Sequence, residues 1–157
     1  SFPTRRSSDL AHPILVTPTS RRRFDENGKS VNTHGDYPDA VRWVAAKENV
    51  PLIELNGMTA ILFNALGVDN STKAFVHYPA GTFPGQTRTL KDNTHFSTYG
   101  AYEVSKCVIE GMKKADLEIV KYLRPDYSGF DPAQPDSFES FKWNLGSFTE
   151  NEKPDGN

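Results

Sequence analysis

The sequence has one cysteine, no long apolar run and no excess of positive charge, and each absence excludes a class of protein. Cys107 alone allows no intrachain disulfide and no cysteine-based metal cluster. Its place within a helical pattern predicts a buried structural thiol and not a nucleophile. No apolar run approaches the roughly 20 residues of a membrane span. The formal net charge of −2 argues against a general nucleic-acid-binding protein, which would show a strong basic excess.

Residues 1–10, SFPTRRSSDL, resemble the translation of a common short-read sequencing adapter. We therefore leave them out of the fold prediction, although a genuine polar tail is the alternative. If they are adapter-derived, the natural reading frame is expected to continue upstream of Ala11. In that case this chain is a truncated part of a longer protein.

Two short apolar runs, residues 13–17 and 50–55, are typical of strands that are buried on both faces of a parallel sheet. Helical patterns follow each run, over residues 36–49 and 58–66, and Gly67 is a plausible stop for the second. Strands that alternate with helices predict an α/β fold whose parallel sheet is covered by helices on both faces. Because two strands make no stable sheet, we expect the remaining strands upstream.

The second half of the chain is expected to begin with a long functional loop over residues 68–91. Ser97 is expected to cap a third helix that ends near Lys114, with a short turn over residues 117–123. Residues 11–123 are then the C-terminal half of one domain. Prolines and aromatic residues predict that residues 124–157 form an extended arm, pinned to the domain as far as about Phe148 and frayed beyond it.

The spacing of Asp92 and His95 predicts a contact between a carboxylate and an imidazole. In a tight turn, Asp92 can accept the Nδ1 proton of His95, which leaves Nε2 free to take a proton from a nucleophile. Such a general base is worth typically about 10²- to 10⁴-fold in rate. The alternative is a helix-entry turn in which the two side chains merely cap the helix.

The residues around this pair resemble the last conserved block of the SGNH/GDSL hydrolases. The string DNTHFSTYGA at residues 92–101 carries the resemblance, and TPTSRRRF at 17–24, FVHYP at 75–79 and FPG at 83–85 are similar to the rhamnogalacturonan acetylesterase-like branch. Together they extend the resemblance over residues 13–143.

The resemblance implies a three-layer α/β/α, flavodoxin-like fold and hydrolysis of O-acyl esters without a metal or cofactor. In such enzymes a serine in a Gly-Asp-Ser block attacks the acyl carbonyl, and Asp92 and His95 match the orienting acid and the general base. This sequence contains no Gly-Asp-Ser and no Gly-x-Asn-Asp block. We therefore expect the nucleophile and the oxyanion hole to lie outside this chain, which alone should be inactive.

Four further residues are candidates for binding substrate. Arg21 and Arg22 follow the first strand, at the sheet edge where ligands of open α/β folds bind, and guanidinium groups fit the carboxylates of a pectin backbone. A solvated cluster facing Asp25 and Glu26 is the alternative. His77 and Tyr78 lie in the long loop, where they could line a cleft or pack to hold the loop.

The remaining histidines, His12 and His34, have no motif context and are expected to be exposed. No spacing of ligands predicts a metal site.

The expected partner is an acetylated polysaccharide or oligosaccharide, with pectic rhamnogalacturonan implied by the resemblance, and neither nucleic acid nor a membrane span is expected. The resemblance suggests a secreted or periplasmic protein, although the residues fix no compartment. The alternative function is a non-catalytic carbohydrate-binding or accessory module; an SGNH lipase is disfavoured because the loops are polar.

Overall fold

The computed structural model describes residues 12–142. Its first two strands, β1 (Leu15–Val16) and β2 (Leu52–Ile53), are parallel, with Leu15 opposite Leu52. Two further backbone bonds lengthen the ladder, from Leu15 N–H to Pro51 O at 2.9 Å and from Thr17 N–H to Ile53 O at 3.1 Å. The predicted parallel pair is therefore present, and it is shorter than the two apolar runs.

Helix α1 (Tyr37–Glu48) connects the two strands and carries Pro38 in its first turn, where its missing N–H costs nothing. Asp36 stands at the N-cap position, but its carboxylate makes no capping hydrogen bond. Its backbone, at φ −92° and ψ 0°, lacks the extended conformation of a capping residue. Asn49 ends the helix in the left-handed conformation.

Helix α2 (Leu55–Asn70) begins earlier than the periodicity predicts, because Glu54 caps it by accepting the Gly57 N–H at 3.2 Å. Gly67 leaves the helical conformation, at φ 72° and ψ 178°. The predicted stop is therefore a sharp break, after which helical hydrogen bonding resumes as far as Asn70. A short 3₁₀ helix, η2 (Ser71–Ala74), follows.

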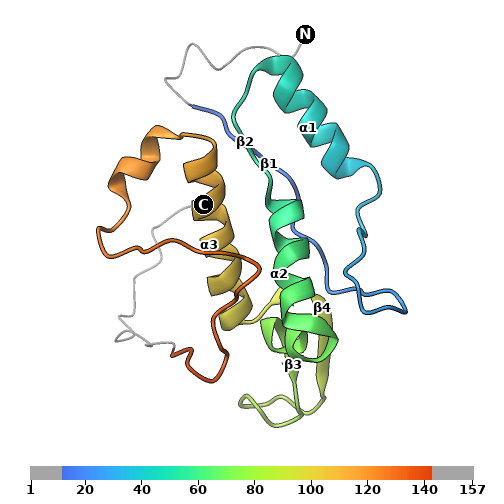
Figure 1. Ribbon diagram of the computed structural model, residues 1–157. Helices are drawn as coiled ribbons and strands as arrows, with labels where there is room; N and C mark the ends of the chain where they lie inside the picture. Colours follow the sequence, from blue (N-terminus) through green and yellow to red (C-terminus); the bar gives the residue numbers. More distant parts are fainter. Residues whose placement is uncertain (1–11, 143–157) are drawn as a thin grey trace, which may run out of the picture.

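The predicted long loop over residues 68–91 contains regular structure, so that prediction is wrong. Strand β3 (Phe75–Tyr78) pairs antiparallel with β4 (Leu90–Phe96). Figure 1 shows this hairpin at the end of the molecule where α2 finishes. Four residues of β3 are too few to show a period of two, which explains why the pattern read as a loop.

Helix α3 (Thr98–Lys114) begins as predicted, with the Ser97 hydroxyl accepting the Gly100 N–H at 3.1 Å. A second 3₁₀ helix, η3 (Glu118–Tyr122), forms the predicted turn after it. Within residues 12–142, no helix is long and apolar enough to cross a membrane.

The strand pair runs between helices, as the sequence predicts. Helix α1 contacts β1, α3 contacts β2, and Figure 1 shows β1 and β2 passing between these helices. Helices α2 and α3 also contact each other, and the core between them includes Phe63, Phe75 and Phe96, with 5.1 Å between the ring centroids of Phe63 and Phe75. Cys107 is fully buried there, as predicted, and burial raises the pKa of its thiol to about 12.

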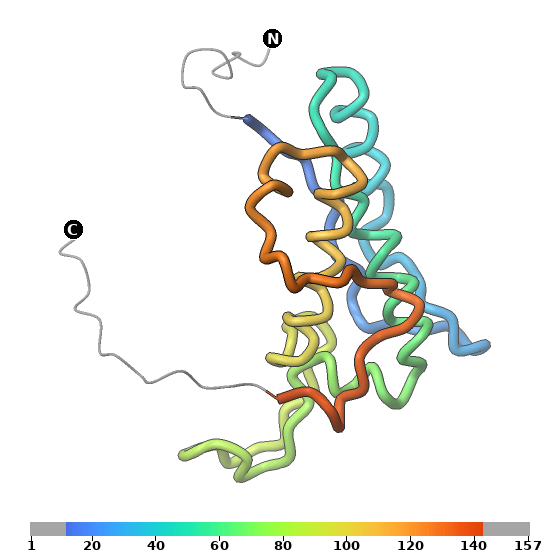
Figure 2. The backbone as a smooth tube through the Cα atoms, turned by 60° about the vertical axis from the view of Figure 1, so that its left-hand side comes forward, coloured from blue at the N-terminus to red at the C-terminus, as the bar shows by residue number. Residues whose placement is uncertain are grey.

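The segment after η3 runs back along α3 towards the hairpin (Figure 2). Tyr99 anchors it, because its ring meets Phe138 and Phe141 edge-on and its hydroxyl donates to Asp136 O at 2.6 Å. Lys106 adds an ion pair of 2.7 Å to Asp136. The division at residue 124 stays a prediction. Trp143, Phe148, the expected frayed end and residues 1–10 lie outside the described residues.

Two glycines occupy the same position in the first turns of α2 and α3, and they provide a matched test of packing. A Cβ on Gly100 would lie 1.8 Å from Ala74 O, whereas a Cβ on Gly57 would have only ordinary contacts, at 3.6 Å and beyond. We expect Gly100→Ala to lower the free energy of unfolding by about 1–3 kcal/mol or more. Gly57→Ala should leave it unchanged or raise it slightly. Urea unfolding of both variants measures this; equal stabilities would contradict the close approach of α3 to η2.

Candidate active site

The segment from Asp92 to His95 bulges out of strand β4. Phe75 pairs with Phe96 and His77 pairs with Lys91, so Val76 alone faces the four residues from Asp92 to His95. Extra residues in one strand leave the ladder and point their side chains in new directions. The bulge therefore displays these four side chains at the edge of the hairpin.

Within the bulge, Asp92 makes three short hydrogen bonds. Its Oδ1 accepts the backbone N–H groups of Thr94 at 2.6 Å and His95 at 3.0 Å, and its Oδ2 lies 2.7 Å from His95 Nδ1. The contact expected from the spacing is thus present. Helix α3 is capped by Ser97 and not by Asp92 or His95, so the structure does not support the alternative in which the pair caps the helix.

This arrangement holds Asp92 as an anion. The backbone N–H of His95, then its side chain, then the N–H of Thr94 lower the pKa of Asp92 to about 2. An ionised carboxylate only accepts hydrogen bonds, so Nδ1 of His95 carries the proton and Nε2 of the neutral ring is an acceptor. The His95 side chain is 77% exposed, and its Nε2 has no partner among the described residues. Chemically, this is a base facing solvent and backed by a fixed negative charge.

The middle of the bulge is tied to two of the predicted substrate residues. Asn93 O accepts the backbone N–H of Arg22 at 2.9 Å, and Asn93 Oδ1 lies 3.2 Å from Nη1 of Arg22 and 2.8 Å from Nε2 of His77. The structure therefore brings Arg22, His77 and the pair Asp92–His95 together. Asn93 joins them, and sequence analysis gave it no role, because an asparagine between two stronger candidates carries no signal of its own.

The other two predicted substrate residues have no contact with the dyad. Arg21 is exposed, with no side-chain hydrogen bond or ion pair to any described residue. Tyr78 packs edge-on against Phe83, with 5.0 Å between ring centroids. Within residues 12–142, no ion pair joins the arginine cluster to Asp25 or Glu26, which was the alternative for these side chains.

A cleft of about 410 Å³ lies between the hairpin and the segment after η3. His77 and Tyr78 line it, together with Phe75, Tyr99, Phe138 and Phe141, whereas neither Asp92 nor His95 does. The cleft expected for His77 and Tyr78 exists, but it does not include the dyad in the described part of the chain.

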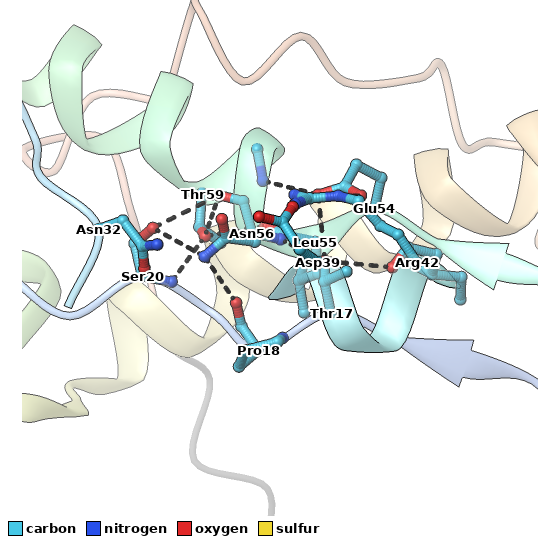
Figure 3. A network of polar contacts seen from close by, with 12 residues as sticks. Thr17, Pro18, Ser20, Asn32, Asp39, Arg42, Glu54, Leu55, Asn56 and Thr59 are labelled. Atoms are coloured by element: carbon cyan, nitrogen blue, oxygen red, sulfur yellow. Dashed lines mark hydrogen bonds and ion pairs between the residues drawn. The ribbon is translucent and has the colours of Figure 1, made fainter. Parts of the chain in front are cut away.

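A polar network fixes the carboxyl ends of the two parallel strands (Figure 3). Glu54 accepts two hydrogen bonds of 2.7 Å from the Arg42 guanidinium and one of 3.2 Å from Thr17 Oγ1. Asn56 donates its backbone N–H to Thr17 Oγ1 at 2.8 Å and its side-chain amide to Pro18 O at 3.0 Å. The loop that carries Arg22 is therefore anchored where it leaves β1.

The remaining histidines take no part in the dyad. His12 is exposed, as expected, but His34 is half-buried, with Nε2 2.8 Å from Thr19 O. The expectation of an exposed His34 is therefore wrong, because its ring packs against the loop after β1. In the part of the chain that the structure describes, no three histidine, cysteine or acidic side chains are placed to hold a metal ion.

Two curated relatives match the same share of this chain. Rhamnogalacturonan acetylesterase RhgT of Bacillus subtilis (strain 168) is 42% identical over 113 residues, which is 72% of this chain and 49% of the relative. Probable rhamnogalacturonan acetylesterase YesY of the same organism is 33% identical over 113 residues, 72% of this chain and 48% of the relative. The chain thus spans about half the length of the curated relatives it matches.

Among solved structures, protein YXIM from Bacillus subtilis shares the fold, with a TM-score of 0.53 and 21% identity over 67% of this chain and 26% of that one. No protein-family model matches the chain. The fold likeness confirms the α/β class, and the names of the two relatives agree with the resemblance that the sequence motifs suggest. Over 72% of its length the chain is therefore similar to rhamnogalacturonan acetylesterases, as the motifs in its sequence predict.

Proposed function

We propose that this chain supplies the acid and base of a serine esterase that removes O-acetyl groups from a polysaccharide, with pectic rhamnogalacturonan as the substrate class. One observation carries the proposal: Asp92 fixes the Nδ1 side of His95 and leaves Nε2 open to solvent. The substrate class rests on the names of the two relatives.

The serine comes from outside the sequence given, which contains no Gly-Asp-Ser block. His95 Nε2 takes the serine hydroxyl proton as the serine oxygen attacks the acetyl carbonyl. The imidazolium, stabilised by Asp92, then gives that proton to the departing sugar oxygen, and an acetyl-serine remains. In the second half, His95 takes a proton from water as the water oxygen adds to the acetyl carbon, and this proton passes to the serine oxygen as acetic acid leaves, which then ionises to acetate in solution.

A hybrid protein tests the base. Residues 12–142 of this chain replace the matching region of RhgT, so that the rest of that relative can supply a nucleophile. The hybrid should release acetate from acetylated rhamnogalacturonan, and His95→Ala should lower kcat by about 10³-fold or more, because the serine loses its proton acceptor. His12→Ala, which removes another exposed histidine, should leave kcat unchanged. Near-normal turnover of His95→Ala would contradict the assignment; binding of the polysaccharide without hydrolysis would favour a non-catalytic carbohydrate-binding module.

The role of Asp92 can be separated from its role in shaping the backbone. Asp92→Asn should lower kcat by about 10²- to 10⁴-fold, because an amide no longer holds the proton on Nδ1 or balances the imidazolium. Asp25 is a matched control: its Oδ1 accepts the N–H groups of Asn27 at 2.9 Å and Lys29 at 2.8 Å, with no histidine attached. Asp25→Asn should therefore leave kcat unchanged. An equal loss in both variants would mean that turn geometry, not the dyad, sets the rate.

The charge on Asp92 also predicts a pH dependence of the bulge. Its pKa is lowered to about 2, below the value of about 3.9 for an unfolded aspartate. The stabilisation that the carboxylate gives the folded bulge is complete above pH 3.9 and is lost as pH falls through about 2. Carboxyl ¹³C shifts followed from pH 7 down to about pH 1 measure it, with Asp92→Asn identifying the signal. A midpoint near 3.9 would show that the bulge does not form these hydrogen bonds in solution.

A further inference from the structure

The hydrogen bonds within the Asp92–His95 bulge join its own residues to one another, and they do not fix where the bulge lies in the fold. Because Val76 alone faces its four residues, the bulge has no complete ladder to hold it against β3. It is also at the surface, with Asn93, Thr94 and His95 exposed. Something outside β4 must fix its position.

We propose that Arg22 and His77 are positioning residues, which act through Asn93 to hold the Asp92–His95 pair where the serine can reach it. This deepens the proposed function and rests on it. It also gives these two side chains a role different from the substrate binding that the sequence suggests for them.

Arg22 connects the bulge to two residues at the end of α2, Val68 and Ser71. Its backbone N–H donates to Asn93 O at 2.9 Å, and its guanidinium donates to Asn93 Oδ1 at 3.2 Å, to Val68 O at 2.6 Å and to Ser71 Oγ at 3.0 Å. Val68 and Ser71 lie where α2 ends and η2 begins. The planar guanidinium holds its donors in one fixed geometry. Arg22 therefore fixes the position of the bulge relative to the end of α2.

His77 holds the bulge from strand β3. It lies on β3 opposite Lys91, at the point where the regular ladder stops. Its Nε2 lies 2.8 Å from Asn93 Oδ1, and because an amide oxygen only accepts, His77 is the donor. That oxygen has two lone pairs and accommodates Arg22 and His77 together. Asn93 is thereby held from the loop after β1 and from β3.

Substrate binding and positioning predict different kinetics. A guanidinium that binds a galacturonate carboxylate affects KM, and only on the polysaccharide. A positioning residue affects kcat on every ester, including a small one without sugar. Misplacing a catalytic group by about 1 Å can cost on the order of 10²-fold in rate. Acetylated rhamnogalacturonan and p-nitrophenyl acetate therefore separate the two roles.

The experiment uses the RhgT hybrid with Asn93→Ala, Arg22→Met, His77→Leu and His77→Gln, assayed below their melting temperatures on both esters. We expect the first three variants to lower kcat by about 10- to 100-fold on both esters with KM unchanged. His77→Gln keeps an N–H donor near the position of Nε2 and should recover most of the rate. Arg23→Met is the matched control, since Arg23 is exposed and makes no side-chain hydrogen bond to a described residue; it should behave as the parent hybrid.

A second readout needs no activity. Ring ¹⁵N shifts of His95 in the full chain report which nitrogen carries the proton, and Asn93→Ala should weaken the preference for Nδ1–H that Arg23→Met retains. Unchanged kcat or unchanged ring shifts in Asn93→Ala would overturn the proposal, as would a rise in KM confined to the polysaccharide in Arg22→Met. Failure of the proposed function looks different, because His95→Ala would then keep its turnover whatever these variants do. An inactive hybrid leaves the decision to the ring shifts.

Discussion

The close approach between Ala74 and the start of α3 sets the geometry of the whole candidate site. Ala74 O accepts the Ser97 N–H at 3.1 Å, and Ser97 Oγ donates to Lys73 O at 2.6 Å. Only a glycine at position 100 leaves room for this contact. It fixes Phe96 opposite Phe75, while the far end of the hairpin fixes Lys91 opposite His77. With both ends held, the residues between them have no place in the ladder and must bulge.

The bulge that results places Asp92 and His95 close enough for the carboxylate to orient the imidazole ring. A general base needs one ring nitrogen fixed and the other free, and a carboxylate three residues away in the same bulge binds Nδ1 and leaves Nε2 open. The same carboxylate satisfies two backbone N–H groups that the bulge takes out of the ladder. Asp92 therefore stabilises both the backbone shape and the orientation of the histidine. The hydrogen bonds from the backbone N–H groups and from the His95 ring both lower its pKa.

The sequence predicts what depends on near neighbours. The contact between Asp92 and His95, the cap at Ser97 and the break at Gly67 each follow from residues within a few positions, and the parallel strands follow from apolar runs ended by proline or by a helix. The β3–β4 hairpin was missed because each strand contributes too few regular residues to show a period. The contacts of Arg22 with Asn93, 71 residues apart in the chain, depend on how the loop after β1 meets the end of α2, and no local pattern contains that information.

Because these contacts are invisible in the sequence, Arg22 and His77 are predicted there as substrate-binding residues. Polar side chains at the carboxyl edge of a parallel sheet, or beside a catalytic motif, are good candidates for substrate contacts because ligands bind there. That edge is also where a catalytic loop must be anchored, and anchoring needs the same donors. The guanidinium of Arg22 already donates hydrogen bonds from all three of its nitrogens, to Ser71, Asn93 and Val68. Arg21, one residue earlier, is exposed. If the arginine cluster binds a galacturonate carboxylate, Arg21 is therefore better placed than Arg22 to do it.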